Sequence, residues 1–182
     1  MSDPVRPDLA PPLPPASRGL PRWWFTGSVA GLIVLADQTA KALVRWQLPL
    51  HDSVPIIPGL LNLTHVRNTG AAFGILNAAD FPFKSAVMLA VAVAAFAAIA
   101  YYATQLPARE TLARLGLTFV LGGAVGNLID RAATGYVLDF VDVYWGGWHF
   151  WAFNVADATI TVGAGLVVLD LIGARRHAPD PV

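Results

Sequence analysis

Four long apolar segments dominate this sequence and restrict what it can fold into. They are Trp24–Trp46, Phe83–Gln105, Thr111–Ile129 and Val155–Ile172. Each is close to the ~20 residues that an α-helix needs to cross a bilayer. With 55% hydrophobic and 13% charged side chains, the chain is also too apolar for an ordinary soluble domain. We therefore predict a membrane protein with four transmembrane helices.

A soluble helical bundle with a very apolar core is the alternative fold. Such a bundle would need a charged face on every helix. The second apolar segment lacks one, because the sequence has no charged residue between Lys84 and Arg109. The membrane fold is therefore the better interpretation.

The chain begins with a proline-rich stretch, residues 1–22. Prolines at this density prevent a helix and leave too few apolar groups for a core, so we predict a disordered cytoplasmic tail. A cleaved signal peptide is the competing interpretation, but the apolar run that follows is too long and contains Asp37 and Lys41. Residues 23–173 then form the membrane domain, and residues 174–182 form a cytoplasmic C-terminal tail.

The basic residues predict how the helices are oriented. Arginines lie beside the N-terminal tail, the connection around Pro107 and the C-terminus, three places that share one side of a four-span protein. The positive-inside rule makes that side cytoplasmic, so both termini lie inside. The two longer connections, residues 48–82 and 130–154, then face outward.

The first outward connection contains short apolar, β-branched stretches. Val54–Ile57 and Leu61–Val66 are separated by the turn signal Pro58-Gly59. We expect a small strand-rich extracytoplasmic element there, lying on the membrane between the first and second spans. The predicted fold class is thus an all-α membrane protein with four transmembrane helices and this one small β-rich element.

Composition excludes several kinds of chemistry. The chain has no cysteine, which removes disulfides, zinc–thiolate sites and a thiol nucleophile. Its formal net charge is zero, so it lacks the basic surface that binds nucleic acid. The four histidines are scattered without metal-ligand spacing, and we predict neither a metal nor another cofactor.

Two aspartates stand where a membrane protein can least easily keep a charge. Asp139 follows the short loop after the third apolar segment, and Asp157 opens the fourth. A carboxylate at the hydrocarbon boundary is costly unless it is paired, hydrated or neutralised, so its presence indicates function. Two neighbouring carboxylates can share a proton and divide the roles of acid and base. The alternative is a solvated loop carboxylate and a simple charge at a helix start.

Further polar or small residues gather at the same outward ends of the predicted helices. They are Asp37, Lys41, Asn68, Gly70, Asn127, Arg131 and Asn154. The inward ends contribute mostly arginines instead. A purely structural protein has no need for that asymmetry.

Five short motifs occur in order along this scaffold: Asp37–Lys41, Arg67–Phe73, Gly126–Arg131, Val137–Phe140 and Phe153–Asp157. Together they resemble the motif set of the lipoprotein signal peptidases, also called signal peptidase II, over about Trp24 to Gly173. The resemblance implies an aspartic intramembrane endopeptidase of the bacterial inner membrane. Its implied partners are membrane lipid and prolipoproteins that carry a diacylglyceryl cysteine, and it cuts just before that cysteine. We expect a monomer.

The resemblance assigns catalysis to Asp139 and Asp157. In an aspartic peptidase one carboxylate takes a proton from water while the other, protonated, donates toward the scissile carbonyl, so no serine or cysteine is needed. Asp157 lies in the first turn of a predicted helix with Asn154 as its N-cap, where the helix dipole favours the anion. We therefore expect Asp157 to be the more readily ionised of the two.

The other motif residues receive supporting roles. Four polar side chains would hold the substrate backbone or orient the aspartates, or else stabilise helix ends and loops: Asn68, Asn127, Arg131 and Asn154. Gly70 would permit a backbone turn or a close approach of the substrate.

Three aspartates and one lysine near the site are interpreted as structural. Asp37 and Lys41 are expected to form a structural or surface pair rather than to take part in the chemistry. Asp130 suits an ion pair with Arg131 or a cap, and Asp142 suits a solvated loop.

The chain departs from the family pattern near the second aspartate. Phe150 is followed by Trp151 where the family usually has proline, and the loop between the aspartates is about one residue shorter. These differences leave the conformation of Tyr144–Ala152 open.

Two other classes of function would also fit a four-span protein. A proton-coupled transporter would need a polar path to the inner side, and below Asp37 the spans offer only Asp170. A scaffold protein would need neither Asp139 nor Asp157.

Overall fold

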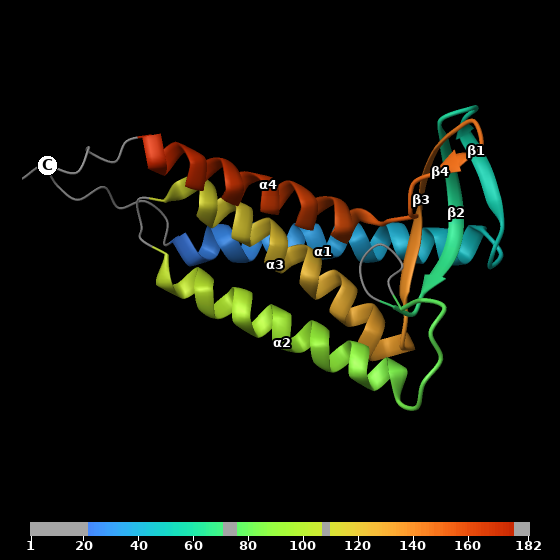
Figure 1. Cartoon of the computed structure of the whole chain (residues 1–182), viewed down its shortest axis with the longest axis horizontal. Helices are drawn as coiled ribbons and strands as arrows, with labels where there is room; N and C mark the ends of the chain where they lie inside the picture. The colour runs from blue at the N-terminus through green and yellow to red at the C-terminus, as the bar shows by residue number, and fades with distance from the viewer. Residues whose placement is uncertain (1–21, 71–75, 107–109, 177–182) are drawn as a thin grey trace, which may run out of the picture.

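The computed structural model describes residues 22–70, 76–106 and 110–176, which contain four helices and four strands (Figure 1). The helices are α1 (Arg22–Gln47), α2 (Lys84–Gln105), α3 (Thr111–Thr134) and α4 (Val155–Arg176). The strands are β1 (Ser53–Ile57), β2 (Leu61–Asn68), β3 (Val137–Trp145) and β4 (Trp148–His149). Residue 22 of the predicted N-terminal tail belongs to α1 and residues 174–176 of the predicted C-terminal tail belong to α4, while the rest of both tails lies outside the described residues.

Each of the four described helices is long and apolar enough to cross a membrane. The stretches with this character are residues 24–47, 84–105, 111–134 and 155–173. Helix α2 is the most apolar of them, as expected from its lack of internal charges. The prediction of four helices of membrane-spanning character is therefore confirmed.

Helix α3 lies at the centre of the bundle and packs against α1, α2 and α4. Glycines on α3 allow this close approach. A Cβ atom at Gly122 would lie 3.1 Å from Ala30 Cα of α1, and one at Gly116 would lie 2.5 Å from the carbonyl oxygen of Gly163 on α4. Larger side chains would force the helices apart, so these glycines are needed for the close packing of α3 against α1 and α4.

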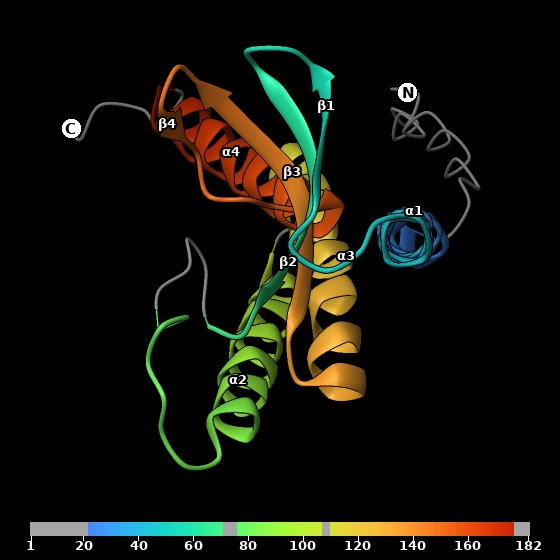
Figure 2. The ribbon, with the colours of Figure 1, turned by 90° about the vertical axis from the view of Figure 1, so that its right-hand side faces the viewer.

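An antiparallel sheet lies at one end of the bundle, with its strands in the order β1-β2-β3-β4 (Figures 1 and 2). We call this the sheet end, and the C-terminal ends of α1 and α3 meet the N-terminal ends of α2 and α4 there. The predicted β-rich element between the first two helices is confirmed by β1 and β2. The prediction is incomplete, because β3 and β4 of the same sheet come from the connection between α3 and α4.

The fold class therefore combines four helices with a sheet and is not all-α. Strand β3 gives no clear strand signal, because its first four residues are all buried and so do not alternate between apolar and polar. Asp139 and Asp142 within it are typical of a loop, although both lie on the strand.

A small apolar cluster fastens the sheet to the bundle. Val44 and Leu48 at the end of α1 pack against Leu138 and Phe140 of β3. Successive side chains of a strand point to opposite faces, so Asp139 points away from this cluster. The cluster thus fixes Asp139 relative to the helices.

The segment after β3 turns back and leads into α4. Strands β3 and β4 form a hairpin around Gly146, whose φ of 60° suits a tight turn. The carbonyl oxygen of Phe153 then accepts a hydrogen bond from the Val141 N–H at 2.8 Å. This return brings Asn154 beside β3. The segment Tyr144–Ala152, which the sequence leaves open, is therefore mainly a β-hairpin.

Candidate active site

Asp139 lies on β3 with only 2% of its surface exposed. Its Oδ1 accepts a hydrogen bond from Asn154 Nδ2 at 2.7 Å, and its Oδ2 accepts one from Asn68 Nδ2 at 3.1 Å. Asn68 is the last residue of β2, and the antiparallel pairing of β2 with β3 places it there. Two amide donors therefore hold the carboxyl group, and the solvated-loop alternative for Asp139 is wrong.

Asp157 lies in the first turn of α4, which Asn154 caps. Asn154 Oδ1 accepts a hydrogen bond from the Asp157 N–H at 2.9 Å, and Asp157 Oδ2 accepts one from the Asn154 backbone N–H at 3.3 Å. This reciprocal pair is a capping box and confirms the predicted N-cap. Asp157 Oδ1 also accepts a hydrogen bond from Asn127 Nδ2 of α3 at 2.8 Å. The carboxyl group is thus held by its own helix and by α3.

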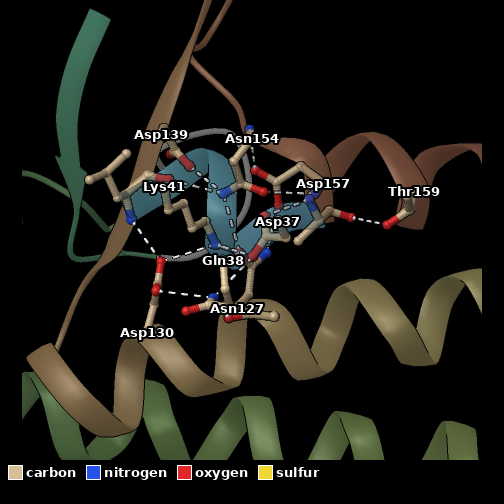
Figure 3. Close-up of polar contacts among 12 residues, drawn as sticks. Asp37, Gln38, Lys41, Asn127, Asp130, Asp139, Asn154, Asp157 and Thr159 are labelled. Carbon is tan, nitrogen blue, oxygen red and sulfur yellow. Dashed lines mark hydrogen bonds and ion pairs between the residues drawn. The ribbon is translucent and has the colours of Figure 1, made fainter. Parts of the chain in front are cut away.

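Asn154 joins the two aspartates, as Figure 3 shows. Its Nδ2 contacts Asp139, while its Oδ1 and backbone N–H contact Asp157. The side chain is fully buried, and its Nδ2 also lies 3.2 Å from Asn127 Oδ1. The fold therefore brings Asp139 and Asp157 from separate elements to one site, as the motif resemblance implies.

Asp139 has a strongly altered acidity. Burial, followed by the negative charge of Asp157, raises the pKa of Asp139 from 3.8 to about 7. Hydrogen bonds from Asn68 and Asn154 and the charge of Lys41 act in the opposite direction. A carboxyl group with a pKa near neutrality can both hold and release a proton at physiological pH. Asp139 is therefore suited to acid–base chemistry.

A buried cation lies close to the pair. Lys41 of α1 is fully buried, and its Nζ lies 2.8 Å from Asp37 Oδ2 and 3.0 Å from Asp130 Oδ2. The same Nζ donates a hydrogen bond to Asn127 Oδ1 at 3.1 Å. These contacts match the three donors of an ammonium group. Since Lys41 binds the oxygen of the Asn127 amide, the nitrogen of that amide is oriented toward Asp157.

Asp37 links this cation to the start of α4. Its Oδ1 accepts a hydrogen bond from the Ala156 backbone N–H at 2.9 Å, which satisfies one of the N–H groups that a first helical turn leaves unpaired. Asp37 and Lys41 are a buried pair four residues apart. They are thus a structural pair, and the surface alternative is wrong.

Asp130 also has a structural role, but with a different cation from the one expected. It pairs with Lys41 instead of Arg131, because Lys41 of α1 reaches it across the helix interface. Its Oδ2 accepts a hydrogen bond from the Leu138 N–H at 3.1 Å and so fixes the start of β3.

Asp142 is buried on β3, so its predicted place in a solvated loop is wrong. Asn62 Nδ2 donates a hydrogen bond to its Oδ2 at 2.9 Å, and His149 Nδ1 lies 2.9 Å from its Oδ1. The strands on either side of β3 supply these partners. Asp142 therefore stabilises the sheet.

Gly70 and Arg131 contact each other beside the pair. Asn68 Oδ1 accepts a hydrogen bond from the Gly70 N–H at 3.0 Å, which closes the turn predicted at Gly70. Arg131 Nη2 donates a hydrogen bond to the Gly70 carbonyl oxygen at 3.1 Å and holds that turn. Residues 71–73 of the same motif lie outside the described residues.

Some supporting residues are not found by sequence reasoning. Gln38 Nε2 lies 3.1 Å from both Asp37 Oδ2 and the Gly126 carbonyl oxygen, and its place inside a motif was the available signal. A second group joins the two ends of a loop and consists of Thr69, Asn77 and Lys84. The spacing of these three residues in the sequence does not predict their contacts.

A groove of about 760 Å³ extends from Asp157 between α2, α3 and α4. Its long walls are apolar and include Met88, Val91, Phe96, Ile99, Val120 and Leu128. Its polar lining lies toward the sheet end and includes Asn68, Asn127, Arg131 and Asp157. The groove thus combines long apolar walls with a polar end at which Asp157 lies.

The fold and the site define a multi-pass membrane enzyme. The structure is similar to two solved bacterial membrane enzymes, determined by the in meso method at 2.3 Å and 1.9 Å resolution. The TM-scores are 0.73 and 0.71, at 28% and 26% sequence identity. The matches cover 87% and 81% of this chain, and 94% and 92% of the solved chains.

The sequence profile of the signal peptidase (SPase) II family matches residues 29–173. The chain is 42% identical over 161 residues to a lipoprotein signal peptidase of Geobacter metallireducens, covering 88% of this chain and 98% of the relative. It is 47% identical over 148 residues to one from Symbiobacterium thermophilum, covering 81% and 94% respectively. The chain therefore belongs to the signal peptidase II family, peptidases that remove the signal peptides of prolipoproteins, and the predicted family and enzyme class are confirmed.

Proposed function

We propose that this protein is an aspartic endopeptidase that cuts diacylglyceryl-modified prolipoproteins just before the lipidated cysteine, with Asp139 and Asp157 activating water. The observation that carries the proposal is the amide of Asn154, which contacts both aspartates. The near-neutral pKa of Asp139 supports its role as the acid. Family membership supports the substrate class.

The proposed reaction begins with Asp157 ionised and Asp139 protonated. Asp157 takes a proton from a water molecule as the water oxygen attacks the scissile carbonyl carbon. Asp139 gives its proton to the carbonyl oxygen, which forms a neutral tetrahedral diol. The diol then collapses: the C–N bond breaks, the proton on Asp157 passes to the leaving amine, and a diol hydroxyl returns a proton to Asp139. Both carboxyl groups are thereby restored.

The groove provides a place for the apolar part of the signal peptide. A helix lying between α2 and α4 would be surrounded by apolar side chains, while its cleavage site would reach the polar lining. Peptide groups that enter a dry site need replacement hydrogen bonds, and Asn68, Asn127 and Arg131 supply donors there. The acyl chains of the substrate would remain in the lipid.

We place the protein in the bacterial inner membrane as a monomer, with both termini cytoplasmic and the site near the outer face. Tryptophans support the sheet end as a membrane–water boundary, since exposed ones occur there: Trp46, Trp145, Trp148 and Trp151. The cysteine-free chain allows a clean test. A membrane-impermeant maleimide should label Ser53→Cys but not Glu110→Cys, which lies between the spans of α2 and α3, in intact spheroplasts. The opposite pattern would reverse the orientation.

The catalytic proposal is tested with purified protein and a diacylglyceryl-modified prolipoprotein. Asp139→Asn and Asp157→Asn should each abolish cleavage while substrate binding is kept. Asp142→Asn is the matched control, because it changes another buried carboxyl group of β3 and should retain activity. Robust cleavage by either of the first two variants would remove that residue from the chemistry.

A further inference from the structure

Lys84, the first residue of α2, is bound to the connection that precedes it. Its Nζ donates hydrogen bonds to Thr69 Oγ1 at 3.0 Å, to the Asn77 carbonyl oxygen at 2.9 Å and to the Ala79 carbonyl oxygen at 2.7 Å. An ammonium group has three donors, and these contacts match all three. The side chain therefore holds both ends of one loop.

The position of this lysine is unfavourable for the helix itself. A cation in the first turn of a helix opposes the helix dipole. Lys84 is also the sole charged residue in the sequence of α2. Its contacts with the loop compensate for this cost, so its role concerns the loop rather than the helix.

Asn77 closes the same loop from its other end. Its Oδ1 accepts hydrogen bonds from the Thr69 N–H and from Thr69 Oγ1, both at 2.9 Å. Thr69 follows Asn68, whose Nδ2 contacts Asp139 Oδ2. The contacts of Lys84 and Asn77 with Thr69 thus end one residue from a hydrogen-bond partner of Asp139.

Lys84 is connected in the other direction to the groove. Met88 lies one turn further along α2, and Met88, Val91 and Phe96 line the groove wall. Among the helices, α2 packs mainly on α3, so Lys84 is a polar link between this wall and the end of β2.

We propose that Lys84, with Asn77 and Thr69, is a positioning residue that couples the groove wall of α2 to the Asn68–Asp139 contact. This inference rests on the proposed peptidase reaction. A signal peptide that seats against α2 sets the position of Lys84, and the loop contacts transmit that position to Asn68. Lys84 itself touches neither the scissile bond nor the aspartates in this scheme.

The test compares steady-state cleavage of a diacylglyceryl-modified prolipoprotein by wild type, Lys84→Met, Lys84→Arg and Asn77→Ala. We expect Lys84→Met to lower kcat about 10-fold with KM changed less than about 2-fold, because the misplaced group acts on the chemical step. Asn77→Ala should also lower kcat. Because Asn77 is exposed, this substitution is not expected to disturb folding, so a lower kcat would not be explained by misfolding. Lys84→Arg keeps the charge and donors and should restore part of kcat.

Asp80→Asn is the matched control, because it removes an exposed charge from the same connection and should leave kcat and KM unchanged. The pH profile gives an independent readout. The hydrogen bond from Asn68 favours ionised Asp139, so its loss should raise the pKa of Asp139. In Lys84→Met the fall of kcat at alkaline pH should therefore begin at a higher pH. An unchanged kcat and pH profile in Lys84→Met and Asn77→Ala, even with lower thermal stability, would overturn the inference.

Failure of this inference can be told apart from failure of the proposed function. If Asp139→Asn still cleaves, the peptidase chemistry itself is wrongly assigned. If wild type cleaves, Asp139→Asn does not, and Lys84→Met behaves as wild type, the coupling alone is wrong.

Discussion

The side-chain amide of Asn154 donates a hydrogen bond to Asp139 at 2.7 Å, while the same residue caps the helix that carries Asp157. One asparagine thus serves helix initiation and carboxyl orientation together. Its nitrogen is directed to Asp139 because its oxygen is already engaged by the Asp157 N–H. The capping box therefore sets the relative placement of the two carboxyl groups.

Replacing Asn154 should separate these two roles. Asn154→Ser keeps a cap acceptor but loses the donor to Asp139, so we expect kcat to fall about 100-fold with little loss of stability. Asn154→Ala loses the cap as well and should cost about 1 kcal/mol more in the free energy of unfolding. Cleavage rates and thermal unfolding of both variants measure this. Equal activity of Asn154→Ser and wild type would show that the amide nitrogen is unimportant.

The pH dependence of cleavage follows from the raised pKa of Asp139. The proposed reaction needs Asp139 protonated, and its pKa is about 7. Activity should therefore be retained below this value and fall as the pH rises through it, approaching a 10-fold loss per pH unit. Measuring kcat between pH 5 and 9 gives this alkaline limb, the fall in activity above the pKa. The apparent pKa obtained from it describes the coupled pair of aspartates rather than one residue.

Asn68→Ala provides the matched test of that limb. The hydrogen bond from Asn68 lowers the pKa of Asp139, so its removal should raise the pKa and move the alkaline limb to higher pH. A shift to lower pH would contradict the assignment of Asp139 as the acid.

Lys41 should be needed for folding as well as for orientation of Asn127. Lys41→Met leaves the buried carboxylates Asp37 and Asp130 without their cation, and removal of one partner of a buried pair costs about 3–5 kcal/mol. Arg45→Met is the control, because Arg45 lies 4.0 Å from Asp130 with its side chain 42% exposed, and such pairs contribute about 0–1 kcal/mol. Denaturant unfolding in mixed micelles measures both. Similar losses in the two variants would contradict the role of the buried cluster.

Local spacing explains which parts of the site can be predicted from the sequence. The capping box lies within four residues, from Asn154 to Asp157, and the Asp37–Lys41 pair spans one helical turn. Such contacts follow from the geometry of a single helix, so they can be predicted once the helix itself is predicted. The placement of Asp139 beside Asp157 depends instead on the motif resemblance.

Contacts between distant elements explain what could not be predicted. From the sequence, Asp130 could pair with either neighbouring Arg131 or distant Lys41. It pairs with Lys41 because α1 packs on α3 and brings the two side chains together. Strand β3 is buried on both faces, so it lacks the alternation that marks a strand. The Asn68–Asp139 contact follows from the β2–β3 register, which the sequence alone does not specify.

Gly126 should be intolerant of any side chain, because it lies directly against the buried Asp37 carboxyl group. A Cβ atom there would lie 2.6 Å from Asp37 Oδ2, the atom that binds Lys41. Gly126→Ala should therefore displace Asp37, weaken its contact with the Ala156 N–H at the start of α4 and lower kcat at least about 10-fold, together with thermal stability. Gly165→Ala on α4 is the control, since a Cβ atom there meets nothing within 4 Å. If Gly126→Ala retained wild-type activity and stability, the start of α4 would not depend on the position of Asp37.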